Sequence, residues 1–238
     1  MARCDDYLRG DSVKIRFYAH ASFRLEVDGF AVITDPYTPG PQNSGFDPID
    51  EPADVVIMSS ATDPFHSDPS HVPGDPTVVN ALELPPEGAE ARGLHVRTFP
   101  AMESMTFNFG RDPDANAMYL FTLGGVRVLH MGDIGNPISR EHLDALHGKV
   151  DLLFALAGAH ATIALDDLDA AIHAIGPRVV IPMHYFSPRG VLDIEPVDTF
   201  LERHPADSVT WVNGSELELT AESLPAEAPR IYVLEQSR

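Results

Sequence analysis

The stretch Val126–Gly135, with the sequence VRVLHMGDIG, constrains the fold more than any other part of the chain. Its apolar residues predict a buried strand that ends at Gly132 and leads directly into Asp133. The two glycines allow the backbone to leave the strand sharply. A carboxylate at the end of a buried strand is held on a rigid scaffold, as a functional site requires. Asp is also a common turn residue, so Asp133 taken alone fits a turn cap equally well.

Strand patterns dominate the first half of the chain. Period-two alternation, or a short apolar run between turn residues, predicts strands at 13–19, 22–27, 30–34, 55–58, 95–99, 117–123 and 126–131. Asp28–Gly29 and Gly124–Gly125 are hairpin signals between consecutive strands. Prolines between residues 67 and 86 exclude a long helix in that segment.

Helices alternate with strands in the second half. Ser139 fits a helix N-cap and Gly148 fits the residue that follows the same helix. An apolar stripe at helical spacing predicts a second helix at about 165–175. A third helix is predicted at 195–203, with strands at 150–156, at 179–185 and between 208 and 233. The simplest packing is one α/β domain over residues 1–238, with helices covering the sheet and residues 1–12 as a mobile N-terminus.

Composition argues against several classes of partner. The formal net charge is −20 and no run of Lys or Arg occurs, which disfavours binding to nucleic acid and to an anionic membrane surface. Cys4 is the single cysteine, so an intrachain disulfide and a cysteine-based zinc cluster are ruled out. No apolar run approaches the roughly 18 residues of a membrane span, and the first residues lack the pattern of a signal peptide. These features predict a cytoplasmic protein.

Residues that bind metals or transfer protons follow several of the predicted strands. They are Asp63 and His66 after 55–58, Glu103 after 95–99, Asp133 after 126–131, and His184 after 179–181. Histidine together with carboxylate suits zinc, manganese or iron at a catalytic site. Each residue alone has a structural alternative, and His184 fits a hydrogen-bonded core histidine equally well. Their repeated placement at strand ends predicts a shared metal site.

Several segments, in their order and spacing, resemble the metallo-β-lactamase fold superfamily, and in particular its ascorbate-6-phosphate lactonase-like branch. These segments are Tyr18–Glu26, Ile33–Pro36, Asp54–Ser59, His130–Asp133, Val150–Leu153 and Ile181–Tyr185. The resemblance extends over about residues 13–219. It implies a four-layer αββα sandwich with a metal site between the two sheets at one edge.

The main metal motif of that family, His-x-His-x-Asp-His, is degenerate in this chain. Aligning its last histidine with His66 places the other three positions at Ala61, Asp63 and Phe65. A register shifted by one residue leaves no ligand at all. The next histidine of the family falls at residues 102–103, where this chain has Met and Glu. Asp133 matches the bridging aspartate of the family, and His184 matches its final histidine.

The resemblance therefore implies a reduced metal site. His66, Asp133 and His184 form a set of two histidines and one carboxylate that can hold one divalent ion with open positions. Asp63 and Glu103 can each add a carboxylate. We expect one ion, with zinc preferred over manganese or iron, rather than a standard dinuclear zinc centre.

The expected chemistry is metal-assisted hydrolysis of a small ester, lactone or phosphoester-like substrate. Asp63 is a candidate catalytic base, because Phe65 stands where the family has the carboxylate that orients water. His160 follows strand 150–156 toward the same edge, where it either serves catalysis by binding substrate or donating a proton, or is a solvent-facing loop residue. Asp35 is expected to orient loops. His20 lies in a turn, which favours the surface, although the family's early Gly/Ala-His motif makes it a similar candidate.

Two other interpretations stay open. Ala61 and Phe65 are apolar at two ligand positions of one motif, which favours a non-catalytic relative that binds a ligand or a partner. A nuclease of the same fold would need a basic surface, which this composition lacks. The expected partner is a small-molecule substrate, with no nucleic acid and no membrane, and association into a homo-oligomer stays open.

Overall fold

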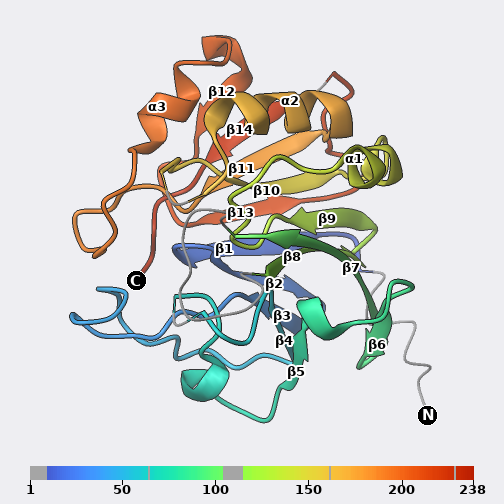
Figure 1. Ribbon diagram of the computed structural model, residues 1–238. Helices are drawn as coiled ribbons and strands as arrows, with labels where there is room; N and C mark the ends of the chain where they lie inside the picture. Colours follow the sequence, from blue (N-terminus) through green and yellow to red (C-terminus); the bar gives the residue numbers. More distant parts are fainter. Residues whose placement is uncertain (1–9, 64, 104–114, 161, 228) are drawn as a thin grey trace.

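Two β-sheets packed face to face form the centre of the molecule (Figure 1). The computed structural model describes residues 10–63, 65–103, 115–160, 162–227 and 229–238. Residues 1–9 of the predicted mobile N-terminus therefore lie outside the described residues. Over the described residues one sheet has six strands and the other has eight. Together with the helices beside them, the two sheets form the predicted α/β sandwich.

The six-stranded sheet has the strand order β13-β1-β2-β3-β4-β5. Its strands are β1 (Val13–Ala19), β2 (Ser22–Val27), β3 (Phe30–Thr34), β4 (Val55–Met58), β5 (Thr77–Asn80) and β13 (Glu216–Leu219). The hairpin of β2 and β3 confirms the signal at Asp28–Gly29, and β1 is also antiparallel to β2. Strands β3, β4 and β5 run parallel. The 3₁₀ turns η1 (Pro69–His71) and η2 (Ala81–Glu83) flank β5, a strand that the sequence pattern did not predict.

The eight-stranded sheet has the order β12-β14-β11-β10-β9-β8-β7-β6. Its strands are β6 (Ala89–Ala91), β7 (Leu94–Met102), β8 (Ala115–Leu123), β9 (Val126–His130), β10 (Leu152–Leu156), β11 (Val179–Met183), β12 (Val209–Trp211) and β14 (Arg230–Val233). The neighbours β9, β10 and β11 are parallel. Parallel strands end at the same edge of a sheet, so the residues that follow these three strands come together.

Strand β7 is longer than predicted. The predicted strand at 95–99 continues to Met102, and Pro100 is paired with Ala117 of β8. Proline cannot donate a ladder hydrogen bond, but β6 pairs only with Leu94–Val96, so β7 has no described neighbour on its other side at Pro100. Glu103 therefore follows the strand end directly, whereas the sequence pattern placed it in a longer exit loop.

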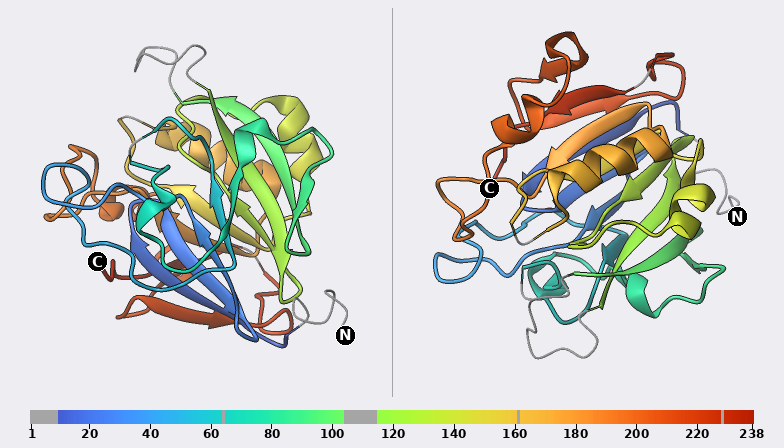
Figure 2. Two further views of the ribbon diagram at one scale, coloured as in Figure 1. Left: turned by 90° about the horizontal axis from the view of Figure 1, so that it is seen from below. Right: turned by 45° about the horizontal axis from the view of Figure 1, so that its top comes forward.

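The described α-helices lie on the outer side of the eight-stranded sheet (Figure 2). They are α1 (Arg140–Leu146), α2 (Leu165–Ile175) and α3 (Val197–Leu201), with the 3₁₀ turn η3 (Ala206–Ser208) after α3. The side chain of Ser139 accepts a hydrogen bond from His142 N, which confirms the predicted cap of α1. The third helix is shorter than the predicted 195–203. Among the described residues, no helix combines the length and the apolar character of a membrane span.

Aromatic side chains fill the space between the two sheets. Phe17 of β1 and Phe23 of β2 stack with ring centroids 4.5 Å apart, and Phe23 stacks on Phe154 of β10 at 4.0 Å. All three side chains are fully buried. Burial of each phenylalanine contributes about 2–3 kcal/mol, so this stack fixes the first hairpin against the eight-stranded sheet. The edge at which the strand ends meet is thereby held in place.

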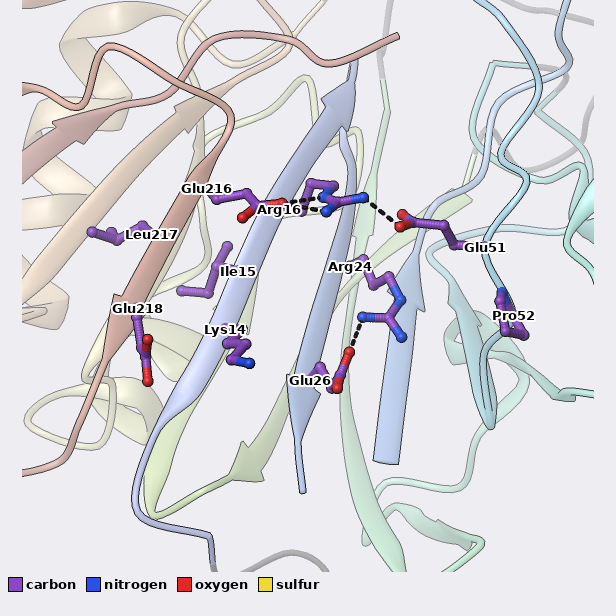
Figure 3. A pocket seen from close by; sticks show the side chains of 10 residues that line it. All are labelled: Lys14, Ile15, Arg16, Arg24, Glu26, Glu51, Pro52, Glu216, Leu217 and Glu218. Atoms are coloured by element: carbon purple, nitrogen blue, oxygen red, sulfur yellow. Dashed lines mark hydrogen bonds and ion pairs between the residues drawn. The ribbon is translucent and has the colours of Figure 1, made fainter. Parts of the chain in front are cut away.

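The outer face of the six-stranded sheet carries charged side chains over β13, β1 and β2 (Figure 3). Arg16 is paired with Glu216 and Glu51, and Arg24 is paired with Glu26. These residues line a cleft of about 530 Å³. The guanidinium groups of Arg16 and Arg24 in this cleft already have carboxylate partners. No α-helix is described on this side of the sandwich, where loops and the η1 turn form the outer layer (Figure 1).

Candidate metal centre

Strand ends from both sheets bring the predicted ligand residues to one edge of the sandwich. Asp63 and His66 follow β4, whereas Glu103, Asp133 and His184 follow β7, β9 and β11. All five side chains are buried, with exposed fractions between 0% and 6%. They divide into two overlapping groups, in each of which the potential ligand atoms lie within 4.8 Å of one another.

His66, Asp133 and His184 form the first group, which we call the His–Asp triad. Nε2 of His66 lies 3.4 Å from Oδ2 of Asp133, and Nε2 of His184 lies 3.6 Å from Oδ1 of Asp133. The two imidazole rings stack 5.2 Å apart. These N···O distances exceed the usual hydrogen bond of about 2.7–3.2 Å. Two ligands about 2.1 Å from one tetrahedral ion would be about 3.4 Å apart, so the triad fits a zinc-like ion.

Asp63, Glu103 and Asp133 form the second group, which we call the carboxylate triad. A set of oxygen ligands favours hard ions such as Mg²⁺, Ca²⁺ or Mn²⁺, whereas imidazole suits zinc and iron. Oδ1 of Asp63 also accepts a hydrogen bond from Phe65 N at 2.7 Å, which fixes the direction of this carboxylate. Because Asp133 belongs to both triads, it occupies the position of a residue that can bridge two sites.

Backbone geometry fixes Asp133. Gly132 has a φ of +61°, and a Cβ at this position would lie 2.4 Å from Oδ1 of Asn116, so only glycine fits. The same oxygen of Asn116 accepts a hydrogen bond from Asp133 N at 2.9 Å. Asn116 on β8 is thus a positioning residue that sequence reasoning missed. It lies just before the predicted strand at 117–123, where a polar residue carries no distinctive signal.

His184 is held through its backbone. Its N–H donates a hydrogen bond to His20 O at 2.8 Å, and its own carbonyl oxygen would lie 2.1 Å from a Cβ added at Gly158. Burial, and then the neighbouring rings of His66 and His20, lower the pKa of His184 well below its usual range. The ring is therefore neutral at pH 7, and it keeps a nitrogen lone pair for an ion.

His20 is buried, with 3% of its surface exposed, so the predicted surface position was wrong. Its ring lies 5.7 Å from the ring of His184 and 4.9 Å from the ring of Phe46. Burial lowers the pKa of His20 to about 3, although the ring also has a hydrogen bond to the backbone of Ser44. The turn between β1 and β2 packs against the segment 36–49, a long-range contact that a local turn pattern cannot reveal.

His160 lies outside both triads, although it follows β10 at the same edge. Its side chain is 59% exposed, and Nε2 lies 3.4 Å from Oε1 of Glu195. Nδ1 lies 3.3 Å from Asp193 O. The structure therefore does not bring His160 to the ligand atoms, and its predicted catalytic role stays a prediction.

A separate buried cluster, which we call the internal network, consists of Asp35, Ser59, Tyr119 and His130. Oδ1 of Asp35 accepts hydrogen bonds from Ser59 N at 2.6 Å and from Ser59 Oγ at 2.7 Å. Oδ2 of Asp35 accepts one from the Tyr119 hydroxyl at 2.8 Å and lies 3.1 Å from Nδ1 of His130. The other ring nitrogen of His130, Nε2, lies 2.8 Å from Ala21 O.

The internal network links the two sheets and orients the segment that carries two ligand residues. Ser59 begins the segment 59–66, which ends in His66, so Asp35 orients this loop. Burial raises the pKa of Asp35 to about 7 and lowers the pKa of His130 to about 3. Both side chains are therefore neutral between those two values. The family resemblance includes His130 in the segment His130–Asp133, but no role was predicted for this residue.

Comparison with known proteins places these features in a family context. A family model described as "Beta-lactamase superfamily domain" matches residues 14–184. A relative from Thermococcus onnurineus, named UPF0173 metal-dependent hydrolase, is 26% identical over 196 residues, which cover 73% of this chain and 84% of the relative. A relative of the same name from Staphylococcus carnosus is 24% identical over 233 residues, which cover 87% of this chain and 96% of the relative.

Solved structures have the same fold. A protein from Thermotoga maritima, described as a Zn-dependent hydrolase of the metallo-beta-lactamase superfamily, matches with a TM-score of 0.71 and 27% identity. That match covers 93% of this chain and 98% of the other. A metallo hydrolase from Ignicoccus hospitalis matches with a TM-score of 0.57 and 20% identity, covering 81% of this chain and 90% of the other, which shows likeness of fold alone.

Proposed function

The chain belongs to the beta-lactamase superfamily and has the metallo-β-lactamase fold, and on this premise we propose that it is a metal-dependent hydrolase of a small ester, lactone or phosphoester-like substrate. The His–Asp triad carries the proposal, because its donor atoms are buried and lie at the spacing of ligands to one ion. The relatives named as metal-dependent hydrolases support the same class of reaction. A divalent ion held there would supply Lewis-acid polarisation of the scissile group and activation of water.

The proposed site holds one ion tightly, through His66, Asp133 and His184. Two imidazoles and a carboxylate suit zinc first, with manganese or iron as alternatives. The carboxylate triad has no nitrogen donor, so it is the weaker site for zinc. In this arrangement Asp63 and Glu103 lie beside the ion, where they would accept protons or orient substrate.

Asp63 is the proposed general base. It is 4% exposed, and its hydrogen bond from Phe65 N holds the carboxylate in one orientation. An oxygen of Asp63 lies within 4.8 Å of an oxygen of Asp133, which places it beside the triad that would hold the ion. A base must lie within hydrogen-bond reach of the proton that it removes, directly or through one water.

His160 is proposed to contact substrate at the rim of the site. Glu195 and the backbone of Asp193 flank its two ring nitrogens, so the ring has a defined orientation although it is exposed. Both partners belong to the loop that begins directly after His184. A small-molecule partner and a cytoplasmic location stay predictions from the composition.

Metal analysis of the protein purified without a chelator tests this proposal. We expect about one equivalent of zinc, manganese or iron in the wild type and none in the double variant His184→Ala/Asp133→Ala. The exposed pair His147→Ala/Asp144→Ala is the matched control, and it should keep the ion. The loaded wild type should also cleave members of a panel of small esters, lactones and phosphoesters. Two tightly bound ions would contradict the single-ion site, and no ion even after soaking would contradict the hydrolase proposal.

A non-catalytic binding role is the second candidate, and Phe65 is the observation that favours it. Its half-buried ring lies 6.0 Å from the ring of His20, at the position where the related motif has a carboxylate. An apolar side chain there cannot orient water. A loaded wild type that binds its ion but cleaves nothing in the panel would favour this second role.

A further inference from the structure

His20 is a buried histidine beside the His–Asp triad, but it belongs to neither triad. Its ring lies 5.7 Å from the ring of His184 and 6.3 Å from the ring of His66. Among the described residues, His20 belongs to no set of three or more potential ligands whose atoms lie within 4.8 Å of one another. Two ligands of one ion are at most about 4.2 Å apart, so His20 does not have the position of a further ligand. It is close enough to touch a molecule that the ion would hold.

One nitrogen of the His20 ring is used and the other is not. The ring has a hydrogen bond to the backbone of Ser44. Nε2 is buried and has no hydrogen-bond partner among the described residues, so we assign the interaction with the Ser44 backbone to Nδ1. With the proton on Nδ1, the neutral ring presents a lone pair at Nε2. A buried acceptor without a partner is costly, and proteins rarely keep one that has no use.

The aromatic neighbours of His20 offer no hydrogen-bond donor to its ring. The rings of Phe46 and Phe65 lie 4.9 Å and 6.0 Å away, and they have no O–H or N–H to offer. Tyr37 lies 6.2 Å away, but its hydroxyl donates to Asp47 O at 2.9 Å. The ring of His20 therefore lies among apolar rings and the two histidines of the triad.

The backbone at His20 is strained in a way that keeps the ring in this place. Its φ is +52°, in the left-handed region that costs a non-glycine residue free energy. The carbonyl oxygen of His20 accepts the hydrogen bond from His184 N at 2.8 Å, which couples the turn to a predicted ligand. Strain of this kind persists where the surrounding structure fixes a residue, and it concentrates at functional sites.

We propose that Nε2 of His20 accepts a hydrogen bond from an O–H group of the molecule that binds at the His–Asp triad. This inference rests on the proposed metal site and adds a substrate-binding residue to it. It also narrows the substrate class to molecules with a hydroxyl or an acidic O–H beside the group that the ion would contact. A protonated phosphate or a hydroxy acid has this chemistry.

Hydrogen phosphate and sulfate form the probe pair that tests the proposal. Near pH 8 both are tetrahedral anions of similar size with two negative charges, but only hydrogen phosphate has an O–H. The dissociation constants of both anions are measured by calorimetry on the zinc-loaded wild type and on the loaded variant His20→Asn. Asparagine tolerates a positive φ and can keep the hydrogen bond to Ser44, but it has no atom at the position of Nε2.

The variant should lose the preference for phosphate selectively. We expect the ratio of the phosphate and sulfate affinities to fall about tenfold in His20→Asn, with one equivalent of zinc retained. The variant His20→Gln places an amide oxygen near Nε2 and should recover part of the ratio. If His20→Asn does not fold, His20→Ser, which also has no atom at the position of Nε2, should show the same fall in the ratio.

His71→Asn is the matched control. His71 holds the same segment 36–49, because Nδ1 accepts from Ile49 N at 3.0 Å and Nε2 lies 2.8 Å from Tyr37 O. This variant should leave the anion ratio unchanged. An unchanged ratio in His20→Asn, an equal loss of both anions, or the same loss in His71→Asn would each overturn the inference. A wild type that binds no zinc would instead overturn the proposed function, so the two failures are distinguishable.

Discussion

Two buried clusters of aspartate and histidine lie at strand ends of this molecule, and they differ in the spacing of their polar atoms. In the internal network, Asp35 meets its partners at 2.6–3.1 Å, which is hydrogen-bond distance. In the His–Asp triad, Asp133 meets His66 and His184 at 3.4 and 3.6 Å, which suits ligands of one ion. Both clusters combine a buried aspartate with buried histidine. The spacing therefore separates a cluster that holds the fold together from one that can hold a metal.

The largest expected effect is the loss of metal from Asp133→Asn. This change keeps the shape of the side chain but removes the negative charge that both triads share. Changes that only disturb the support of a ligand cost about 10–100-fold in metal affinity, so we expect a loss of more than about 100-fold. A chelator competition measures the affinity. Asp144→Ala on the exposed face of α1 is the control, and retention of wild-type affinity in Asp133→Asn would contradict the assignment.

The next effect is on stability, and it comes from the other cluster. Asp35→Ala leaves Ser59, Tyr119 and His130 without their common partner inside the protein. Buried polar groups left in this way cost about 1–3 kcal/mol, so we expect a loss of about 2 kcal/mol in the free energy of unfolding. Urea unfolding in the presence of a chelator measures it, because bound metal then adds nothing. A stability equal to that of wild type would show that the network contributes little.

A smaller effect appears in the pH dependence of stability. Burial raises the pKa of Asp35 from 3.8 to about 7, so its contribution is fully present below 3.8 and is lost as pH rises through 7. Burial lowers the pKa of His130 from 6.5 to about 3, so its contribution is present above 6.5 and is lost as pH falls toward 3. Between pH 3.8 and 6.5 the folded and unfolded pairs each hold one proton. The pH dependences of the two contributions therefore cancel between pH 3.8 and 6.5.

Asp35→Asn removes one side of that cancellation. The titration of His130 is then no longer offset by that of Asp35, whereas His20 and His184 titrate in the same way in both proteins. Relative to wild type, stability should therefore fall more steeply as pH falls from 6.5, by up to about 1.4 kcal/mol per pH unit. Urea unfolding of wild type and variant at pH 6.5, 5.5 and 4.5 gives the difference in slope. Parallel slopes in the two proteins would show that His130 and Asp35 are not neutral partners in the folded state.

The sequence predicted the parts of the fold that local patterns determine. The Gly-Asp exit at 132–133 and the hairpins at Asp28–Gly29 and Gly124–Gly125 follow from the backbone preferences of glycine, and the structure has all three. The cap at Ser139 is likewise a local effect. The shared site was predicted from the repeated placement of ligand residues at strand ends, and the family resemblance implied its position between the sheets at one edge.

Features that depend on contacts between distant segments could not be predicted in the same way. The burial of His20 depends on the segment 36–49 lying against the β1–β2 turn. The passage of β7 through Pro100 depends on β6 being too short to pair there. The role of His130 depends on its 3.1 Å approach to Asp35, a residue of the other sheet. Nothing in the local sequence distinguishes His130, in the internal network, from His184, in the triad.

The smallest expected effect concerns His160, which resembles neither cluster because it is exposed. An ion pair at the surface contributes about 0–1 kcal/mol, and the 3.4 Å approach to Glu195 is of this kind. His160→Ala should therefore change the free energy of unfolding by less than about 0.5 kcal/mol and leave the metal content unchanged.

If the ring of His160 contacts substrate at the rim, the KM of His160→Ala for a cleaved substrate should rise by about threefold to tenfold, with kcat little changed. Steady-state kinetics of His160→Ala beside the exposed control His147→Ala measure this split. An equal loss of kcat in His160→Ala alone would instead indicate a proton transfer through this ring, and no change in either constant would leave His160 outside the site.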